Sequence, residues 1–167
     1  MSLKWYQRPR LVALDPATPV LDAARAIENN SIGAVVVQEK GQVVGIVTDR
    51  DLAIRVVGRG LDPKTTQLRD VMTTPVITLS LRDGQDDAIR IMQERNVRRI
   101  PLVERGGVVG MVTLDDLLLD EVASLDQLAA IVQAQIGAGG PAVSPKSRGA
   151  MRSVARAEAT YGRLINQ

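Results

Sequence analysis

The sequence predicts an α+β fold that approaches the α/β pattern, in which two βαββα repeats pack around a pseudo-twofold axis and a helical extension follows. One observation behind this prediction is a duplication. Shifting the chain by 65 positions aligns residues 8–52 with residues 73–117 without a gap, and thirteen of those 45 positions are identical. The other is that both copies show the same succession of apolar runs and turn residues. A unit of about 45 residues is too small to bury both faces of its own sheet, so the two copies are expected to share one core.

Each repeat opens with a short apolar run and an amphipathic stretch of helical period, and it continues with two β-branched runs. The expected strands are residues 11–14, 34–37 and 43–47 in the first repeat and residues 76–79, 100–103 and 108–112 in the second. Short turns containing Gly41 and Gly106 join the β-branched runs, which predicts two hairpins. The runs are apolar almost throughout, so both faces of the sheet should be covered. A second helix should begin after Thr48 in one copy and after Thr113 in the other.

The domain boundaries are predicted from changes in composition. They are residues 1–60 for the first repeat, 61–72 for a connector, 73–122 for the second repeat and 123–167 for the helical extension. In the extension, apolar residues recur at helical spacing from Leu118 to Ile136. A Gly/Pro-rich linker follows, and a final basic helix is expected from Ala150 to Ile165.

The composition excludes several kinds of site. The chain has no cysteine and no histidine, which removes disulfides, thiolate nucleophiles, imidazole bases and the usual zinc ligands, and no metal site is expected. Trp5, Tyr6 and Tyr161 are the only aromatic residues, so a flat ligand would have to be held by aliphatic side chains. No apolar run approaches the roughly 18 residues that a membrane span needs. The expected compartment is the cytoplasm.

A chemically informative motif occurs twice, as GIVTDRDL from Gly45 and as GMVTLDDL from Gly110. Thr48 and Thr113 should cap the helix that follows, and the helix start favours a nearby anion. Asp51 and Asp116 then fall in the first helical turn, where a carboxylate can accept both hydroxyls of a vicinal diol such as a ribose. Ordinary helix capping is the alternative explanation of a threonine and an aspartate at this spacing, and it does not exclude binding.

From about Arg8 to Glu121 the chain resembles a tandem pair of cystathionine-β-synthase-type (CBS) domains, a regulatory arrangement known as the Bateman module. The resemblance is carried by the two motifs above, by NVRRIPLVE at residues 96–104 and by LRDVMTTPVITL at residues 68–79. It implies two clefts between the repeats that bind adenine nucleotides, namely AMP, ADP, ATP, NAD or S-adenosylmethionine. It also implies dimerisation into a flat disk.

The resemblance further implies that the two clefts are crossed, so that each motif is completed by residues of the other repeat. Asp51 and Thr48 would be joined by Thr78, Val97, Arg98, Arg99 and Ile100. Asp116 and Thr113 would be joined by Ala13, Ile32, Gly33, Ala34 and Val35.

An asymmetry between the clefts is predicted from these residues. Arg98 and Arg99 stand where the first repeat has Gly33 and Ala34, so only the Asp51 cleft should receive two guanidinium groups from this segment. Because arginine binds phosphate in a bidentate way, that cleft should hold a phosphorylated ligand more tightly. Arg50 could partly offset the difference by reaching the Asp116 cleft. The alternative is that both arginines are surface charges beside a buried strand.

The basic charge of the chain is confined to its last segment. Residues 139–167 carry five basic side chains and one acidic side chain, a net charge of +4, whereas residues 1–138 sum to −2. Such a tail could bind nucleic acid, an anionic membrane or an acidic partner. Five charges without interleaved aromatic residues favour the simpler interpretation, a solvated face of a helix that packs on its own dimer.

The leading hypothesis is a regulatory sensor without catalytic activity or catalytic cofactor, which binds an adenosine nucleotide, forms a homodimer and acts on an unknown protein target. The second hypothesis is an interaction protein with structural repeats, whose basic tail docks nucleic acid or a partner protein. An enzyme is the third. Acid–base catalysis would need a positioned pair of carboxylates, and the Asp49/Asp51 and Asp115/Asp116 pairs are better explained by capping and diol binding.

Overall fold

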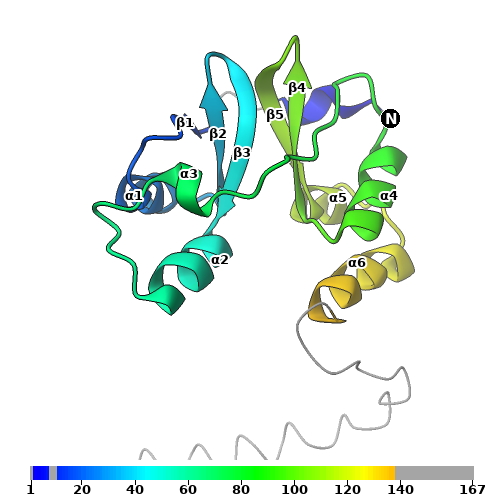
Figure 1. Ribbon diagram of the computed structural model, residues 1–167. Helices are drawn as coiled ribbons and strands as arrows, with labels where there is room; N and C mark the ends of the chain where they lie inside the picture. Colours follow the sequence, from blue (N-terminus) through cyan, green and yellow to red (C-terminus); the bar gives the residue numbers. More distant parts are fainter. Residues whose placement is uncertain (1, 8–10, 138–167) are drawn as a thin grey trace, which may run out of the picture. The chain divides into compact units, whose positions relative to one another are not determined.

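The computed structural model describes residues 2–7 and 11–137, and it divides into two units, Met1–Ile131 and Val132–Gln167. Both repeats lie in the first unit (Figure 1). The predicted linker and final basic helix fall outside the described residues. Across the part of the chain that is described, none of the helices is long and apolar enough to cross a bilayer.

The first repeat contains a three-stranded sheet of order β1-β2-β3, with β1 parallel to β2 and β2 antiparallel to β3. Its elements are β1 (Ala13–Leu14), α1 (Val20–Asn30), β2 (Ala34–Glu39), β3 (Gln42–Thr48) and α2 (Asp49–Asp51). The helix that begins with α2 continues through a π-helical segment, η2 (Leu52–Val56), and a 3-10 turn, η3 (Val57–Arg59). The predicted βαββα order is therefore confirmed in this repeat.

The second repeat follows the same plan with a weaker first strand pairing. Its elements are α4 (Gln85–Arg95), β4 (Arg99–Glu104), β5 (Gly107–Thr113) and α5 (Leu114–Leu119). The expected first strand is reduced to a single parallel bridge between Leu79 and Leu102. In the first repeat the amide of Val36 donates to the carbonyl of Val12 (3.0 Å), but the position 65 residues after Val36 is Pro101, which has no amide hydrogen. The loss of that donor accounts for the shorter pairing.

Both hairpins form as predicted. Their two-residue turns place Lys40 (φ 49°) and Gly41 (φ 79°) in the left-handed region, as they do Arg105 (φ 52°) and Gly106 (φ 86°). Two consecutive positive φ angles define the type I′ turn, whose twist matches that of the strands it joins. The hairpins of the two repeats also contact one another, since the amide of Val43 donates to the carbonyl of Gly106 (3.3 Å).

Each repeat is completed by a short helix that precedes the other repeat in the chain. These helices are η1 (Leu3–Tyr6) and α3 (Leu68–Val71), and the same shift of 65 residues relates them. α3 precedes the second repeat in the chain, yet the amide of Leu68 donates to Thr18 of the first repeat (2.9 Å). η1 precedes the first repeat, yet the amide of Leu3 donates to Asp83 of the second (3.0 Å). The duplication therefore extends further back than the sequence alignment indicated, and part of the predicted connector lies in the core of the first repeat.

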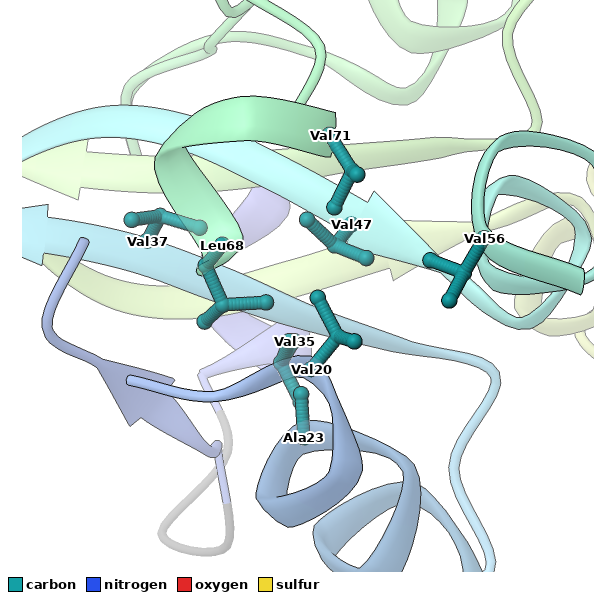
Figure 2. Close-up of a cluster of buried hydrophobic side chains, with 8 residues drawn as sticks. All are labelled: Val20, Ala23, Val35, Val37, Val47, Val56, Leu68 and Val71. Carbon is teal, nitrogen blue, oxygen red and sulfur yellow. The ribbon is translucent and has the colours of Figure 1, made fainter. Parts of the chain in front are cut away.

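The core of the first repeat is a cluster of aliphatic side chains on one face of its sheet, where Val35 and Val37 of β2 lie beside Val47 of β3 (Figure 2). Its buried members are Val20, Ala23, Val35, Val37, Val47, Val56, Leu68 and Val71. They come from α1, β2, β3, η2 and α3. The helical elements α1, η2 and α3 therefore cover the same face of the sheet. Because almost every member is β-branched, the same residues that favour the strands also fill the interior.

The helical pattern after the second repeat is interrupted. α5 ends at Leu119, and α6 (Leu125–Gly137) begins after a turn in which Glu121 adopts φ 53°. Ser124 starts the new helix, because its hydroxyl accepts a hydrogen bond from the amide of Gln127 while the Gln127 side chain accepts one from the amide of Ser124. The apolar periodicity from Leu118 therefore spans two helices rather than one.

Candidate functional site

A cavity of about 310 Å³ lies between the two repeats, at the start of α5. Its wall is formed by Leu11, Val12, Ser31, Ile32, Gly33, Ala34, Arg99, Met111, Thr113, Asp115, Asp116 and Leu119. The structure thus brings together five of the residues expected around Asp116, namely Ile32, Gly33, Ala34, Thr113 and Asp116 itself. Leu11 and Val12 line the wall where the sequence indicated Ala13, which is exposed and does not line the cavity.

Asp116 is held in place by the end of β5. Its Oδ2 accepts hydrogen bonds from the amide (2.8 Å) and the hydroxyl (2.6 Å) of Thr113, while the amide of Asp116 donates back to the Thr113 hydroxyl oxygen (3.2 Å). The single hydroxyl proton of Thr113 is therefore committed to Asp116. We conclude that Thr113 positions the carboxylate in the cavity wall.

The first repeat contains the same capping box, with Thr48 in contact with Oδ2 of Asp51 through its amide (3.0 Å) and its hydroxyl (2.8 Å). Oδ1 of Asp51 is engaged by Arg55, which lies 3.1 Å away. The same guanidinium donates to the carbonyl of Val71 (2.6 Å) and to the hydroxyl of Thr73 (3.0 Å). Asp51 is thus part of a network that ties its helix to the segment between the repeats.

Several backbone amides at the two helix starts are already paired within the protein. The amide of Asp49 donates to Gly33 (3.2 Å) and that of Leu114 donates to Arg98 (2.9 Å). The amides of Asp51 and Asp116 are taken by their capping threonines. Four of these amides are therefore already used within the protein, and a basic side chain in the cavity wall is a further candidate partner for a negative group.

Arg99 supplies such a side chain, and this corrects the sequence prediction. It was expected in the Asp51 cleft, but it lines the Asp116 cavity instead. The reason is strand register. Arg99 is the cross-strand partner of Thr113 at the end of the β4–β5 pair, so both side chains emerge on the same face. The guanidinium that the sequence assigned to the Asp51 cleft is therefore found at the Asp116 cavity, while the predicted difference in phosphate affinity stays a prediction.

Gly33 makes room for Arg99. A Cβ added to Gly33 would lie 2.7 Å from Cζ of Arg99, well inside van der Waals contact. The side chain of Arg99 therefore crosses from the second repeat to the bare backbone of the first.

The other predicted site residues have different surroundings. Arg98, Thr78 and Arg50 are exposed, Val97 is half-buried, and none of the four lines the cavity. Ile100 and Val35 are fully buried core residues.

The glycine that opens each motif has a structural role that was only partly foreseen. A Cβ on Gly45 would lie 2.9 Å from Cγ of Met72, and one on Gly110 would lie 3.1 Å from the carbonyl carbon of Tyr6. Each glycine therefore allows the segment that follows an exchanged helix to cross the strand closely. At both positions, the group that lies next to the glycine belongs to another segment of this chain.

The N-terminal segment is fastened to the second repeat by Tyr6. Its hydroxyl donates to Oδ2 of Asp120 (2.6 Å) and accepts from the Gln85 side chain (2.8 Å). Burial, assisted by the hydrogen bond to Asp120, raises the pKa of Tyr6 to about 12. Sequence reasoning missed this network, although a tyrosine and a glutamine among otherwise apolar positions could have indicated it.

Comparison with known proteins places these features in a family. The sequence model of the CBS domain matches residues 6–58 and again residues 68–121. An uncharacterised protein of Methanopyrus kandleri is 34% identical over 132 residues, which cover 76% of this chain and 67% of the relative.

Two solved structures share the fold. A conserved CBS domain protein of unknown function from Thermoplasma acidophilum superposes with a TM-score of 0.75 at 24% identity, covering 88% of this chain and 83% of that one. The CBS domain pair of protein MJ0100, in complex with 5′-methylthioadenosine and S-adenosyl-L-methionine, gives a TM-score of 0.65 at 22% identity, covering 74% of this chain and 98% of its own. Because both halves match one sequence model and the paired arrangement recurs in these structures, the chain belongs to the CBS domain family.

Proposed function

We propose that this protein is a regulatory module, without catalytic activity, that binds an adenosine-containing ligand in the cavity at Asp116. The observation that carries the proposal is the cavity itself, which both repeats line and which has a positioned carboxylate in its wall. A ligand there would contact both halves of the molecule. Its binding energy could then favour one arrangement of the repeats over another, which is what a sensor requires.

The chemistry of the wall suits a nucleoside. Aliphatic side chains from both repeats, among them Val12, Ile32 and Met111, offer a surface for a flat base. Asp116 offers acceptor oxygens to the ribose hydroxyls. Ligand pockets range from roughly 300 to 1,000 Å³, and a volume of about 310 Å³ is at the lower end. This volume favours a mononucleoside ligand such as AMP or an S-adenosyl compound over NAD.

The ligands of the MJ0100 domain pair support the adenosine class, because both of them are adenosine derivatives. The same class is proposed for the Asp51 cleft, with Thr48, Thr78, Val97, Arg98 and Ile100 as its expected surroundings. Arg55 already occupies Oδ1 of Asp51, so a ribose in that cleft would have to share the carboxylate with a guanidinium. We propose the Asp116 cavity as the tighter site, because residues of both repeats line it.

Isothermal titration of the full chain with adenosine, AMP, ADP, ATP, NAD and S-adenosylmethionine tests the proposal. Asp116→Asn should weaken the tightest ligand by about tenfold or more, because a charged acceptor contributes about 1.5–3 kcal/mol. Asp51→Asn is the matched control, since it changes the same capping box in the other repeat, and it should leave that affinity within about threefold. The proposal fails if no adenosine compound binds at millimolar concentration, or if the Asp116 variant binds as tightly as the wild type.

A homodimer is proposed for the assembled protein. The second helices of the two repeats expose apolar side chains, with exposed fractions of 78% for Val57 and 80% for Leu119. Ile54 and Leu119, both exposed, are related by the 65-residue shift, so the surface recurs in both repeats. Light scattering after gel filtration should give twice the chain mass, and Val57→Asp should lower it to the mass of one chain. A monomeric wild type would contradict this proposal.

The second hypothesis, an interaction protein with structural repeats, predicts no nucleotide binding, so the titration above distinguishes the two. Its basic segment, residues 139–167, lies outside the described residues. A cytoplasmic location and an unidentified protein target remain part of the proposal, and affinity capture from lysate with and without the ligand would test the target.

A further inference from the structure

The helices that end the two repeats expose similar apolar side chains but carry different charges. Residues 49–59 contain three arginines and two aspartates, a net charge of +1. The equivalent residues 114–124 contain four acidic side chains and no basic one, a net charge of −4. The shift of 65 residues pairs Arg50 with Asp115 and Arg55 with Asp120, so two arginines of the first repeat are replaced by acids in the second.

On each of these two surfaces, a charged side chain lies next to an exposed apolar one. Arg50 precedes Ile54 by four residues, as Asp115 precedes Leu119, and side chains at this spacing are neighbours on a helix. All four are exposed, with exposed fractions of 52% for Ile54 and 80% for Leu119. In the part of the chain that the structure describes, neither Arg50 nor Asp115 takes part in an ion pair. Both charges are therefore accessible to a second molecule.

A dimer with a twofold axis can bring these surfaces together in two ways. In a head-to-head dimer each surface meets its own copy, so the acidic residues 114–124 of two molecules would face one another. In a head-to-tail dimer the surface of the first repeat meets the partner's second repeat, so Arg50 of one chain lies near Asp115 of the other. Opposite charges across an interface favour association, whereas like charges cost binding energy. The charge pattern therefore favours the second arrangement.

We propose that the protein forms a head-to-tail dimer, in which residues 49–59 of each molecule pack against residues 114–124 of the other. The inference rests on the homodimer of the proposed function and adds its orientation. The exposed apolar side chains supply the area that is buried, and the opposite charges select the pairing of unlike repeats. Because Asp115 and Leu119 also line the Asp116 cavity, this pairing places the partner's first repeat beside that cavity.

Charge reversal tests the orientation. Arg50→Asp or Asp115→Arg alone should weaken dimerisation about 10- to 100-fold, since an attraction becomes a repulsion at two symmetric places. The double variant should dimerise within about threefold of the wild type, because it restores opposite charges. In a head-to-head dimer each residue would meet its own copy before and after the change, so neither single variant would weaken the dimer in this way. Sedimentation equilibrium of the full chain measures each dissociation constant.

The matched control for charge reversal is Arg105→Asp. Arg105 is exposed and precedes β5, whereas Asp115 follows it, so the control makes the same change at the opposite end of that strand. It should leave the dissociation constant within about threefold. Thermal melting of each variant verifies that it is folded.

Cross-linking gives a second readout, because the chain has no cysteine and an introduced thiol is unique. Ile54→Cys and Leu119→Cys are purified separately, mixed to exchange subunits and treated with a short bismaleimide. The cross-linked fraction should be higher in the mixture than in either variant alone, since the head-to-tail dimer brings Ile54 to the partner's Leu119.

The outcomes distinguish the orientation from the proposed homodimer. A monomeric wild type would overturn both. A dimeric wild type whose single charge reversals dimerise as tightly, or whose double variant stays as weak as the single ones, would overturn the orientation and leave the homodimer standing. Cross-linking of either cysteine variant alone to the same extent as the mixture would overturn the orientation as well.

Discussion

Arg55 holds Asp51 in an ion pair of 3.1 Å, whereas the residue 65 positions later in the second repeat is Asp120, an acid rather than an arginine. The duplicated carboxylates are therefore not equivalent. Asp51 stabilises the structure between the repeats through Arg55, whereas Asp116 lines a cavity. One copy of the motif is tied to the segment between the repeats, and the other lies in the wall of a cavity.

Removal of the Arg55 side chain should separate the structural role of Asp51 from the proposed ligand-binding role of Asp116. Arg55→Ala is expected to lower the free energy of unfolding by about 1–2 kcal/mol, because it deletes a partly buried ion pair and two hydrogen bonds to the segment between the repeats. It should leave binding at Asp116 unchanged. Urea denaturation measures the first effect, with the exposed Arg59→Ala as control. A loss no larger than that of the control would show that the Arg55 contacts do not stabilise the folded protein.

Tyr6→Phe should destabilise the protein through a pair of lost hydrogen bonds. The side chain is 5% exposed, and its hydroxyl joins Asp120 to Gln85. The substitution leaves Gln85 without its acceptor, so a loss of about 1–3 kcal/mol is expected. The emission of Trp5, which lies on the same short helix, should report the release of the segment. The exposed Lys4→Ala is the control, and equal stability of Tyr6→Phe and wild type would contradict the prediction.

The same tyrosine should make stability depend on alkaline pH. Burial raises the pKa of Tyr6 from 10.0 to about 12, so the folded state holds the proton more tightly than the unfolded state does. This contribution is fully present below pH 10 and is lost as the pH rises from about 10 to about 12. The difference in unfolding free energy between wild type and Tyr6→Phe should therefore shrink over that interval and stay constant from pH 7 to 9. A constant difference up to pH 12 would be inconsistent with the raised pKa.

The two motif glycines should respond differently to alanine. At Gly110 the new Cβ meets backbone atoms of Tyr6 and Gln7, which cannot rotate away. At Gly45 it meets the flexible side chain of Met72. Gly110→Ala should therefore cost about 2–3 kcal/mol and Gly45→Ala about 1 kcal/mol or less, within the range known for overpacking.

A double variant checks the cause of the Gly45 effect. If Met72 is the group that must move, Met72→Ala should be less destabilising in the Gly45→Ala background than alone. Thermal and urea unfolding of the four proteins gives the coupling energy. Strict additivity would show that Met72 is not the obstacle.

Much of the fold could be predicted because the signals are local and repeated. The turn pairs Lys40-Gly41 and Arg105-Gly106 determine the hairpins, and Thr48 and Thr113 determine where the second helices begin. The side chains around Asp116 could be assigned from the family resemblance, since backbone position suffices for residues as short as Gly33 and Ala34.

The features that were missed depend on distant parts of the chain. Which cleft Arg99 enters is decided by a long side chain and by the absence of one at Gly33, and neither is visible from strand spacing. The weakened first pairing in the second repeat follows from Pro101, whose missing amide matters only once its partner is known. The role of η1 was missed because its sequence, LKWY, shares only the first leucine with the LRDV of α3, although Leu3 and Tyr6 are buried at the positions equivalent to Leu68 and Val71.

The exchange of η1 and α3 has a consequence for the origin of the chain. A fragment that stops at residue 60 would lack Leu68 and Val71 and would leave its own Leu3 and Tyr6 with nothing to cover, so neither half is self-sufficient. A single ancestral copy with this layout could complete itself only by swapping its first helix with an identical subunit. Gene fusion of such a swapped pair would give the present arrangement, and the join between the copies would then record what was once a boundary between two molecules.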